Sequence, residues 1–495
     1  MDAALKSLGV IFDPSHFLML ILGVLVGLSI GILPGLGGIV GMSILLPIIY
    51  GMDPHTAFAL LIGMVAVIPT SDTFPSVMMG IPGSSASQAT IMDGYPLAKK
   101  GEAARALGAA FTVSLMGGLF GAAVLSVIVP IARPIVLAFG SPELFMLALL
   151  GLSMVGVLSG KRPIKGVLAA GIGLMIGALG DAPAVPEYRY TFGIDYLMDG
   201  IPLVIVGLGL FAFPEIVDLL IKGKAISEVA TLGKGWLDGV KDALRHKFII
   251  LRCSMIGVIV GFLPGLGGSV VDWIAYGHVI QTTRDRENFG KGDIRGVIAP
   301  ESANNAKEGG GLIPTLLFGI PGSGSMAVFL GGLLILGIQP GPAMVTENVD
   351  LLYTAIWSLA LANVFGAGLC IFLSKPITRL TVIPFTYLAP FMILIITLAS
   401  YQASRGWGDL IALLVMGILG WVMKQYGWPR PAALIGYVLS DNIETYLFIS
   451  VQRYGLSWIA RRGVIILALI IIASLAMGVF WQRKKAPRLG GDHAN

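Results

Sequence analysis

Residues 27–38 read GLSIGILPGLGG and residues 257–268 read GVIVGFLPGLGG, with eight of twelve positions identical at an offset of 230. A second pair follows in the same order: FPSVMMGIPGS at 74–84 and IPTLLFGIPGS at 313–323, with six of eleven positions identical. A third, weaker pair matches Pro202, Gly207, Leu210 and Glu215 to Pro431, Gly436, Leu439 and Glu444. Three matching blocks in one order predict that the chain consists of two homologous halves.

The composition places this duplicated chain in a membrane. Of its 495 residues 56% are hydrophobic and only 12% are charged, whereas a soluble domain is roughly 25% charged. Too little charge is left to cover the several cores that a soluble protein of this length would form. Both cysteines, Cys253 and Cys370, lie in apolar stretches and predict neither a disulfide framework nor a zinc site. The sequence predicts an all-α polytopic membrane protein.

The apolar stretches predict about 12 transmembrane helices, some of them broken helices or re-entrant hairpins. We expect a first membrane repeat at 1–221, a cytoplasmic basic linker at 222–247, a second membrane repeat at 248–450, and an extra span with a basic cytoplasmic tail at 451–495. The linker and the tail hold the strongest clusters of Lys and Arg, which favour the cytoplasmic side. Counting back from the linker gives an odd number of crossings in the first half. The repeats are therefore expected to be inverted, with a cytoplasmic C-terminus.

Both repeated motifs interrupt hydrophobic stretches with proline and glycine, which break helices. Inside a membrane, broken backbone is tolerated only where protein or a watery cavity receives the free polar groups. Breaks at matching places in two repeats are a pointer to the binding site of a secondary transporter. The backbone positions expected to form this site are Pro34, Gly35, Gly37, Gly38, Gly83, Pro264, Gly265, Gly267, Gly268 and Gly322.

Polar residues surround the second break in each half. A helix that begins after GIPGS would present free N–H groups and serine hydroxyls to an anion. We predict substrate binding by Ser84, Ser85, Ser87, Asn304, Asn305, Lys307, Ser323 and Ser325. Freed carbonyls and acidic side chains would instead suit a sodium ion, and we assign ion coupling to Ser71, Asp72, Thr73, Glu301 and Ser302. Ordinary helix caps and interhelical hydrogen bonds are the alternative role for the Ser and Asn residues.

Charged side chains inside a span cost about 2.5–3.5 kcal/mol each on insertion scales, so the few that occur deserve a functional explanation. They are Asp72, Asp272, Glu301, Lys307 and Glu308. Two roles fit Lys307 equally well: attraction of a carboxylate substrate, or neutralisation of Glu308 or Glu301. Glu215 and Glu444 lie towards span ends, where facing water would explain them.

Enzymatic and ATP-driven functions find no support in the motifs. The chain contains no GxxxxGK[ST] loop for ATP, no HExxH, and no metal-like spacing among its five histidines. A serine hydrolase built on Ser84 or Ser323 would need a base nearby, and none is evident. We therefore expect no enzymatic activity, no structural metal and no cofactor apart from Na⁺ or H⁺ as a coupling ion.

The doubled GILPGLGG and GFLPGLGG, the two GIPGS motifs and APESANNA at 299–306 resemble the large membrane subunit of tripartite tricarboxylate transporters. The resemblance runs from about 17 to 481. It implies a permease of the bacterial inner membrane, of about 12 spans, that works with a small four-span membrane subunit and a periplasmic solute-binding protein. Import of citrate or another carboxylate would be driven by a sodium or proton gradient.

The residues and the resemblance agree on a gradient-driven carrier for an anion. Two other functions remain open at this point. A non-transporting scaffold or receptor subunit would need no ion dependence, and a passive anion channel would accumulate nothing against a gradient. No feature of the sequence points to nucleic acid.

Overall fold

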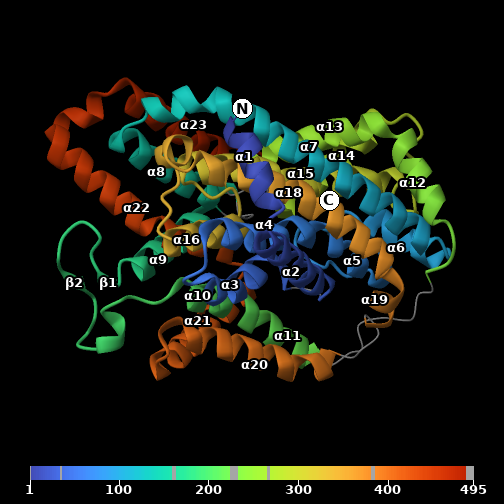
Figure 1. The fold of residues 1–495 in the computed structure, drawn as a ribbon, viewed down its shortest axis with the longest axis horizontal. Helices are drawn as coiled ribbons and strands as arrows, with labels where there is room; N and C mark the ends of the chain where they lie inside the picture. Colours follow the sequence, from blue (N-terminus) through green and yellow to red (C-terminus); the bar gives the residue numbers. More distant parts are fainter. Residues whose placement is uncertain are drawn as a thin grey trace, which may run out of the picture.

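The computed structural model of the protein describes residues 2–33, 36–158, 163–222, 232–264, 268–380 and 385–485. Within these ranges nearly all regular structure is helical (Figure 1). The two strands, β1 (Gly180–Asp181) and β2 (Tyr188–Arg189), pair antiparallel in one small hairpin. The all-α fold class predicted from the composition is confirmed.

The first half contains thirteen of the described helices, two of them not α-helical. They are α1 (Asp2–Ile11), α2 (Pro14–Ile32), α3 (Gly37–Ile49), α4 (Pro54–Ser71), α5 (Thr73–Met79), α6 (Ile91–Lys99), α7 (Ala103–Ala138), α8 (Ser141–Leu158), α9 (Pro163–Gly177), the 3-10 helix η1 (Asp195–Leu197), α10 (Leu203–Gly207), the π-helix η2 (Leu208–Ala212) and α11 (Phe213–Lys222).

A short helix, α12 (Trp236–Arg245), lies in the predicted linker, and all regular structure described after it is again helical. The remaining elements are α13 (Lys247–Phe262), α14 (Gly268–Thr282), α15 (Arg295–Phe318), α16 (Gly324–Ile335), α17 (Pro342–Thr346), α18 (Val349–Phe372), α19 (Ser374–Leu380), α20 (Phe385–Ser404), α21 (Trp407–Gln425), α22 (Arg430–Tyr454), the 3-10 helix η3 (Gly455–Ala460) and α23 (Arg462–Lys485).

Five described helices are long and apolar enough to cross a membrane by length and composition. They are Pro14–Ile32, Pro54–Met79, Ala103–Ala138, Val349–Phe372 and Trp407–Gln425. A sixth is added if Arg430–Ala460 and Arg462–Ala473, which meet at a bend of 72°, are counted as one span. Shorter apolar helices make up much of the remainder, so the expected count of about 12 crossings stays a prediction, as do the division into domains and the inverted orientation of the repeats.

The two halves use the same helix–helix contact. In the first half α2 packs on α4, and in the second α13 packs on α15. A Cβ added to Gly27 would come within 2.5 Å of the Met64 carbonyl oxygen, and one added to Gly257 within 2.2 Å of the Ala303 carbonyl oxygen. Both pairs keep the offsets of the repeated motifs, 230 for the glycines and 239 for their partners. Small residues at these matching positions let the backbones approach closely, as is common between membrane helices.

Hydrogen bonds define two ends of the helix bundle. At the Asp350 end, the hydroxyl of Ser7 donates to the Asp350 carbonyl oxygen at 2.9 Å, and His55 Nε2 lies 3.2 Å from Asp350 Oδ2. At the Asp242 end, Arg105 Nε donates to Asp242 Oδ2 at 2.7 Å. Helix α4 begins at the Asp350 end, whereas α7 and α12 meet at the Asp242 end.

The Asp350 end and the Asp242 end lie at opposite ends of the bundle. Helices α4 and α15 run between them in antiparallel directions. Asn305 of α15 bonds to Thr70 of α4, and Glu301, one turn earlier in α15, bonds to Thr73, just after α4. At a rise of about 1.5 Å per residue, the 24 residues of α15 extend about 36 Å. Figure 1 shows α15 in the middle of the ribbon, and all but two of its residues are buried.

Two helical hairpins enter the bundle from these opposite ends. In the first hairpin, α2 begins near the Asp350 end, where His16 Nε2 lies 3.1 Å from the Ser358 hydroxyl of α18, and α3 returns to that end. In the second, α13 begins beside α12 at the Asp242 end, and α14 returns there. The PGLGG motifs fall between the two helices of each hairpin, and their described residues Gly37, Gly38 and Gly268 line one cavity inside the bundle.

Candidate substrate and ion site

The two GIPGS motifs end their helices in the same way. Gly80 after α5 and Gly319 after α15 both have left-handed backbones, with φ of 66° and 68°. Each donates its N–H to the carbonyl oxygen of a proline five residues earlier, Pro75 or Pro314. Glycine enters this conformation without the steric cost of a Cβ, and it is the common way for a helix to end. The helix breaks therefore lie where both motifs predict them.

Beyond the break the two halves differ. In the second half α16 begins at once, and the Ser323 hydroxyl caps it by accepting from Met326 N at 3.3 Å. In the first half the next helix begins only at Ile91, so the expectation of a helix directly after GIPGS holds for one half alone. The Ser84 hydroxyl instead donates to the Asp72 carboxylate and accepts from Ala86 N at 3.0 Å. The first-half serines thus shape a loop beside Asp72.

A cavity of about 540 Å³, which we call the central cavity, contains parts of all four motifs. Four helices begin at its wall: α3 at Gly37, α14 at Gly268, α16 at Gly324 and α22 at Arg430. Neither Leu36 before α3 nor Pro429 before α22 makes a side-chain cap. The first N–H groups of each helix lack partners within the helix, and the dipole is positive there. The wall is therefore favourable for an anion.

Six of the predicted substrate or ion residues line the central cavity: Asp72, Ser84, Ser85, Lys307, Ser323 and Ser325. They come from both halves, and the hairpin turns complete the wall. A Cβ on Gly38 would come within 2.4 Å of the Ser325 hydroxyl oxygen, and one on Gly268 within 2.5 Å of the Ala86 Cβ. Residues that are more than 180 positions apart in the chain thus form one site.

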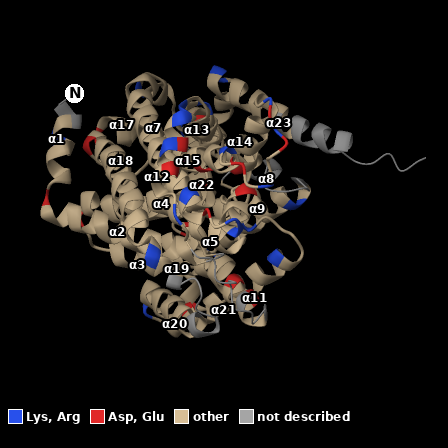
Figure 2. Ribbon diagram, turned by 90° about the vertical axis from the view of Figure 1, so that its right-hand side faces the viewer, with Lys and Arg blue, Asp and Glu red and all other residues tan. Residues whose placement is uncertain are grey.

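The central cavity is lined by equal numbers of basic and acidic side chains. Lys307, Lys424 and Arg430 are opposed by Asp72, Glu215 and Glu308. Lys307 Nζ lies 2.5 Å from Glu308 Oε1, so of the two roles expected for Lys307 the structure contains the neutralising contact with its neighbour. Figure 2 shows how few charged residues interrupt the ribbon.

Asp72 and Glu301 are both completely buried, yet their surroundings differ. The Glu301 carboxylate accepts from three hydroxyls, those of Thr90 at 2.6 Å, Thr73 at 2.7 Å and Ser114 at 3.4 Å. Asp72 accepts from Ser84 on one oxygen, and its Oδ1 has no partner within the described residues. Since an unpaired buried carboxylate is costly, Asp72 has the greater need for a proton or a cation.

The asparagines of α15 add further oxygen atoms without partners. Asn305 Nδ2 donates to Thr70 Oγ1 at 2.7 Å and to Asn363 Oδ1 at 3.0 Å. Among the described residues, Asn305 Oδ1 and both amide atoms of Asn304 have no hydrogen-bond partner, although both side chains are buried. No group of three or more His, Cys, Asp or Glu side chains in the same ranges could hold a metal ion. Amide and carboxylate oxygens remain as ligands for a hard cation.

The other predicted polar residues make local contacts. Ser71 donates to the Gly27 carbonyl oxygen at 3.2 Å, and Ser302 to the Ala299 carbonyl oxygen of its own helix at 3.0 Å. The Ser87 hydroxyl accepts from Ser84 N at 3.3 Å. These bonds fit helix packing and loop closure, which was the alternative role for such residues.

The predicted backbone positions divide into three groups. Pro34, Gly35, Gly265 and Gly267 lie outside the described residues. Gly37, Gly38 and Gly268 line the central cavity, whereas Pro264 is buried. A Cβ on Gly83 would come within 2.5 Å of the Asp72 carbonyl oxygen, and one on Gly322 within 2.6 Å of the Gly261 carbonyl oxygen. The last two glycines therefore allow the segment after each break to lie against a neighbouring helix.

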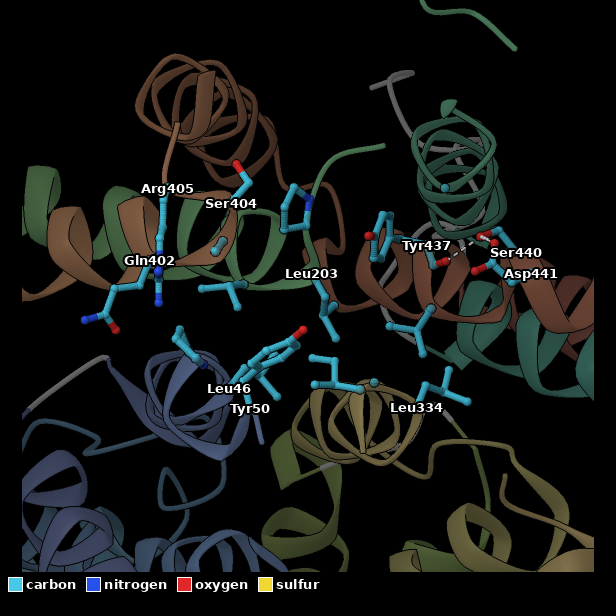
Figure 3. A pocket seen from close by; sticks show the side chains of 18 residues that line it. Leu46, Tyr50, Leu203, Leu334, Gln402, Ser404, Arg405, Tyr437, Ser440 and Asp441 are labelled. Atoms are coloured by element: carbon cyan, nitrogen blue, oxygen red, sulfur yellow. Dashed lines mark hydrogen bonds between the residues drawn. The ribbon is translucent and has the colours of Figure 1, made fainter. Parts of the chain in front are cut away.

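A second cavity, which we call the outer cavity, has a volume of about 980 Å³. Figure 3 looks into it, with Gln402 and Arg405 on one side and Ser440 and Asp441 on the other. Four stretches of chain line both cavities: α3, α16, α22 and the run from α10 to α11. Tyr50 in its wall places the outer cavity towards the Asp350 end.

A packed layer separates the two cavities. Along α3 the central cavity reaches Ile39 and the outer cavity begins at Leu46, with Ser43 between them. Ser43 faces Gly207, whose added Cβ would come within 2.1 Å of the serine hydroxyl oxygen. The same helices thus form a wall for each cavity and a barrier between them.

Sequence reasoning predicted Lys307 but missed the other two basic residues of the central cavity, Lys424 and Arg430. Glu215 Oε2 lies 2.7 Å from Lys424 Nζ, and Glu215 Oε1 lies 3.0 Å from Arg430 Nη2. The recurrence of Glu215 as Glu444 in the third repeated block was the available signal. Glu444 is also paired, with Arg189 at 2.7 Å, so neither glutamate simply faces water.

Comparisons with known proteins match the chain to one family model and to two curated relatives. A family model described as "Tripartite tricarboxylate transporter TctA family" matches residues 17–435. An "uncharacterized 52.8 kDa protein in TAR-I ttuC' 3'region" of Agrobacterium vitis is 31% identical over 442 residues, which cover 88% of this chain and 86% of that protein. An "uncharacterized protein in TAR-II ttuC' 3'region" of the same organism is 33% identical over 195 residues, 39% of this chain and 79% of that protein. No solved structure matches.

Proposed function

The chain belongs to the TctA family of tripartite tricarboxylate transporters, and we propose that it is the permease subunit of a secondary transporter that imports citrate or a related carboxylate. The observation that carries this proposal is the central cavity, where four helix N-termini, serine hydroxyls from both halves and three basic side chains surround one space. Such a wall stabilises negative charge through free N–H groups and hydroxyl donors.

The proposed assembly follows from the family. The permease would lie in the bacterial inner membrane with its C-terminus in the cytoplasm, beside a small four-span subunit, and would receive substrate from a periplasmic binding protein. Inverted repeats are part of this proposal, and the two hairpins that enter from opposite ends of the bundle support them. In alternating access of this kind the binding site lies near the interface of the two repeats. The barrier that closes it lies first on one side of the membrane and then on the other.

We assign the outer cavity to the periplasmic approach and the Ser43–Gly207 layer to the closed barrier. This assignment rests on the predicted cytoplasmic position of the linker, since the outer cavity lies towards the opposite end of the bundle. Substrate would cross when α3 and α10 separate at this layer.

Asp72 is the residue proposed to couple transport to an ion gradient. Its unpaired oxygen is free to bind a proton or a cation, whereas each oxygen of Glu301 already accepts a hydrogen bond from a hydroxyl. Either a proton on Asp72 or a sodium ion beside it would remove the buried charge, and the ion would be released when the site opens to water.

Uptake of labelled citrate tests the function. Proteoliposomes that contain the permease, the small subunit and saturating binding protein are given a sodium gradient or a proton gradient in turn. We expect concentrative uptake with one of them, abolished by replacing Ser84 and Ser323 with tryptophan. Ser29→Trp, on an exposed face of α2, is the matched control.

The outcomes separate the three functions. Equilibration without any gradient would identify a passive channel. An assembled complex without uptake of any carboxylate would favour a scaffold or receptor subunit. Unchanged uptake by the Ser84 and Ser323 variants would place the substrate elsewhere.

A further inference from the structure

Arg430 lies where the helix dipole disfavours it. It is the first residue of α22, and a positive charge at a helix N-terminus is normally unfavourable. Lys424, on the opposite side of the same loop, lies in the last turn of α21, where a positive charge is favoured. The position of Lys424 thus has a structural explanation, whereas that of Arg430 calls for a second one.

The contacts of Arg430 leave part of its guanidinium available. Nη2 donates to Glu215 Oε1 at 3.0 Å and Nη1 to the Leu210 carbonyl oxygen at 3.0 Å, while the guanidinium carbon lies 5.2 Å from the centre of the Phe211 ring. A guanidinium carries five N–H donors. The side chain is 16% exposed and lines the central cavity.

Glu215 joins the two basic residues through different oxygens. Its Oε2 accepts from Lys424 and its Oε1 from Arg430, and Lys424 is also 2.6 Å from Asp218 Oδ2. If Oε1 loses Arg430, Glu215 and Lys424 are still paired, and neither is left as an isolated buried charge. The Arg430–Glu215 contact is therefore the one that a competing carboxylate can replace at least cost.

We propose that Arg430 binds a second carboxylate group of the substrate, and that Glu215 occupies the same guanidinium when the site holds no substrate. This inference rests on the proposed function. One substrate carboxylate lies at the helix N-termini near Ser323 and Ser325, and another replaces Glu215 on Arg430 in the planar, two-bonded geometry that guanidinium and carboxylate favour.

The exchange makes Arg430 a specificity residue. A dicarboxylate or tricarboxylate reaches both anchors, whereas a monocarboxylate reaches one and leaves the Glu215 pair intact. Because the internal glutamate competes with the substrate, removal of its charge should strengthen substrate binding. A merely structural ion pair would give the opposite result, since its loss would weaken the site.

The test uses the purified full-length protein in lipid nanodiscs, titrated with citrate, tartrate and lactate while thermal stabilisation is followed. For Arg430→Gln we expect half-saturation by citrate and tartrate at concentrations about tenfold higher, equivalent to about 1.4 kcal/mol, with little change for lactate. Arg430→Lys keeps the positive charge but loses the paired N–H donors of the guanidinium, so its half-saturating concentrations should lie between those of the native protein and Arg430→Gln. Glu215→Gln should bind citrate more tightly than the native protein.

Arg189→Gln is the matched control, because Arg189 pairs with Glu444, the repeat counterpart of Glu215, and does not line the central cavity. It should leave all three titrations unchanged. An equal loss for citrate, tartrate and lactate in Arg430→Gln, or weaker citrate binding in Glu215→Gln, would overturn the inference while leaving the carboxylate site in place. If the native protein responds to none of the three, the proposed function itself fails and the inference with it.

Discussion

The Thr73 hydroxyl donates a hydrogen bond of 2.7 Å to Oε2 of Glu301, joining residues from the two halves that are both completely buried. Thr73 begins α5 directly after the break at Asp72, and Glu301 lies in the central helix α15. Thr90 and Ser114 donate to the same carboxylate. Through Glu301, α15 therefore holds three separate parts of the first half in position around the site.

The first prediction concerns these hydroxyls. Thr73→Val and Thr90→Val preserve shape but remove a donor to a buried carboxylate, so each should destabilise the protein by about 1–3 kcal/mol. Thermal unfolding of the detergent-solubilised protein at a fixed scan rate measures the change. Thr112→Val is the control, because its hydroxyl bonds to the Gly108 carbonyl oxygen of its own helix. Equal decreases of the unfolding temperature in all three variants would show that the hydrogen bonds to Glu301 stabilise the protein no more than an ordinary hydroxyl bond within a helix.

The second prediction separates binding from coupling. Asp72→Asn removes the charge that we propose the coupling ion neutralises, so uptake driven by the gradient should be lost while carboxylate binding persists. Counterflow in proteoliposomes, which needs no ion gradient, should continue. Asp350→Asn at the Asp350 end, where the carboxylate is half-exposed, should leave accumulation unchanged. Retained accumulation in Asp72→Asn would exclude Asp72 from coupling.

A third prediction tests the contact between the first hairpin and the second half. Gly38→Ala adds a Cβ within 2.4 Å of the Ser325 hydroxyl oxygen and 3.2 Å of its Cβ, so the hydroxyl must rotate away from its present position and α16 must yield slightly. We expect citrate uptake to fall strongly. Replacing Ser325 with glycine in the same protein removes the clash and should restore uptake to the level of the Ser325→Gly variant alone, which lacks one hydroxyl of the proposed site. Absence of rescue would mean that Gly38 is needed for another reason, such as the backbone of the turn.

The fourth prediction concerns the barrier between the cavities. Cysteines introduced at Ser43 and Gly207 would lie within reach of a disulfide, since the Cβ added to Gly207 lies 3.1 Å from Ser43 Cβ. The bond needs a Cβ–Cβ distance of about 3.5–4.5 Å, so α3 and α10 would have to move slightly apart. Oxidation should stop uptake, and a reductant should restore it. Each single cysteine variant should be insensitive to the oxidant, because the native Cys253 and Cys370 are buried. Full uptake by the crosslinked protein would show that substrate does not pass between α3 and α10.

The sequence predicted the features that depend on local chemistry. The breaks after Met79 and Phe318 followed from glycine and proline in GIPGS, and the all-α class followed from the scarcity of charge. The duplication was visible because both halves retain the residues of the same turns. In each case the physical cause lies within a few neighbouring residues.

Features that depend on distant packing could not be predicted. Nothing in the local sequence places Arg430 opposite Glu215, because their meeting depends on how the helices α22 and α11 both pack on η2 and α21. Ser84 and Ser323 occupy equivalent positions in GIPGS, yet only Ser323 caps a helix. The difference arises from the residues that follow: the apolar run after Ser325 continues as a helix, whereas the first-half segment turns back beside Asp72.

Helix α15 has a consequence for how the protein is made. It is the central helix, yet it is absent from the five spans that length and composition identify, because Glu301, Lys307, Glu308 and several polar residues dilute its apolar content. Each charged residue near a helix centre costs about 2.5–3.5 kcal/mol on insertion scales. The insertion machinery would therefore find α15 a poor candidate when it emerges from the ribosome. If α15 is one of the predicted spans, its stable insertion would depend on α7 and α13, which pack on it and are synthesised before it.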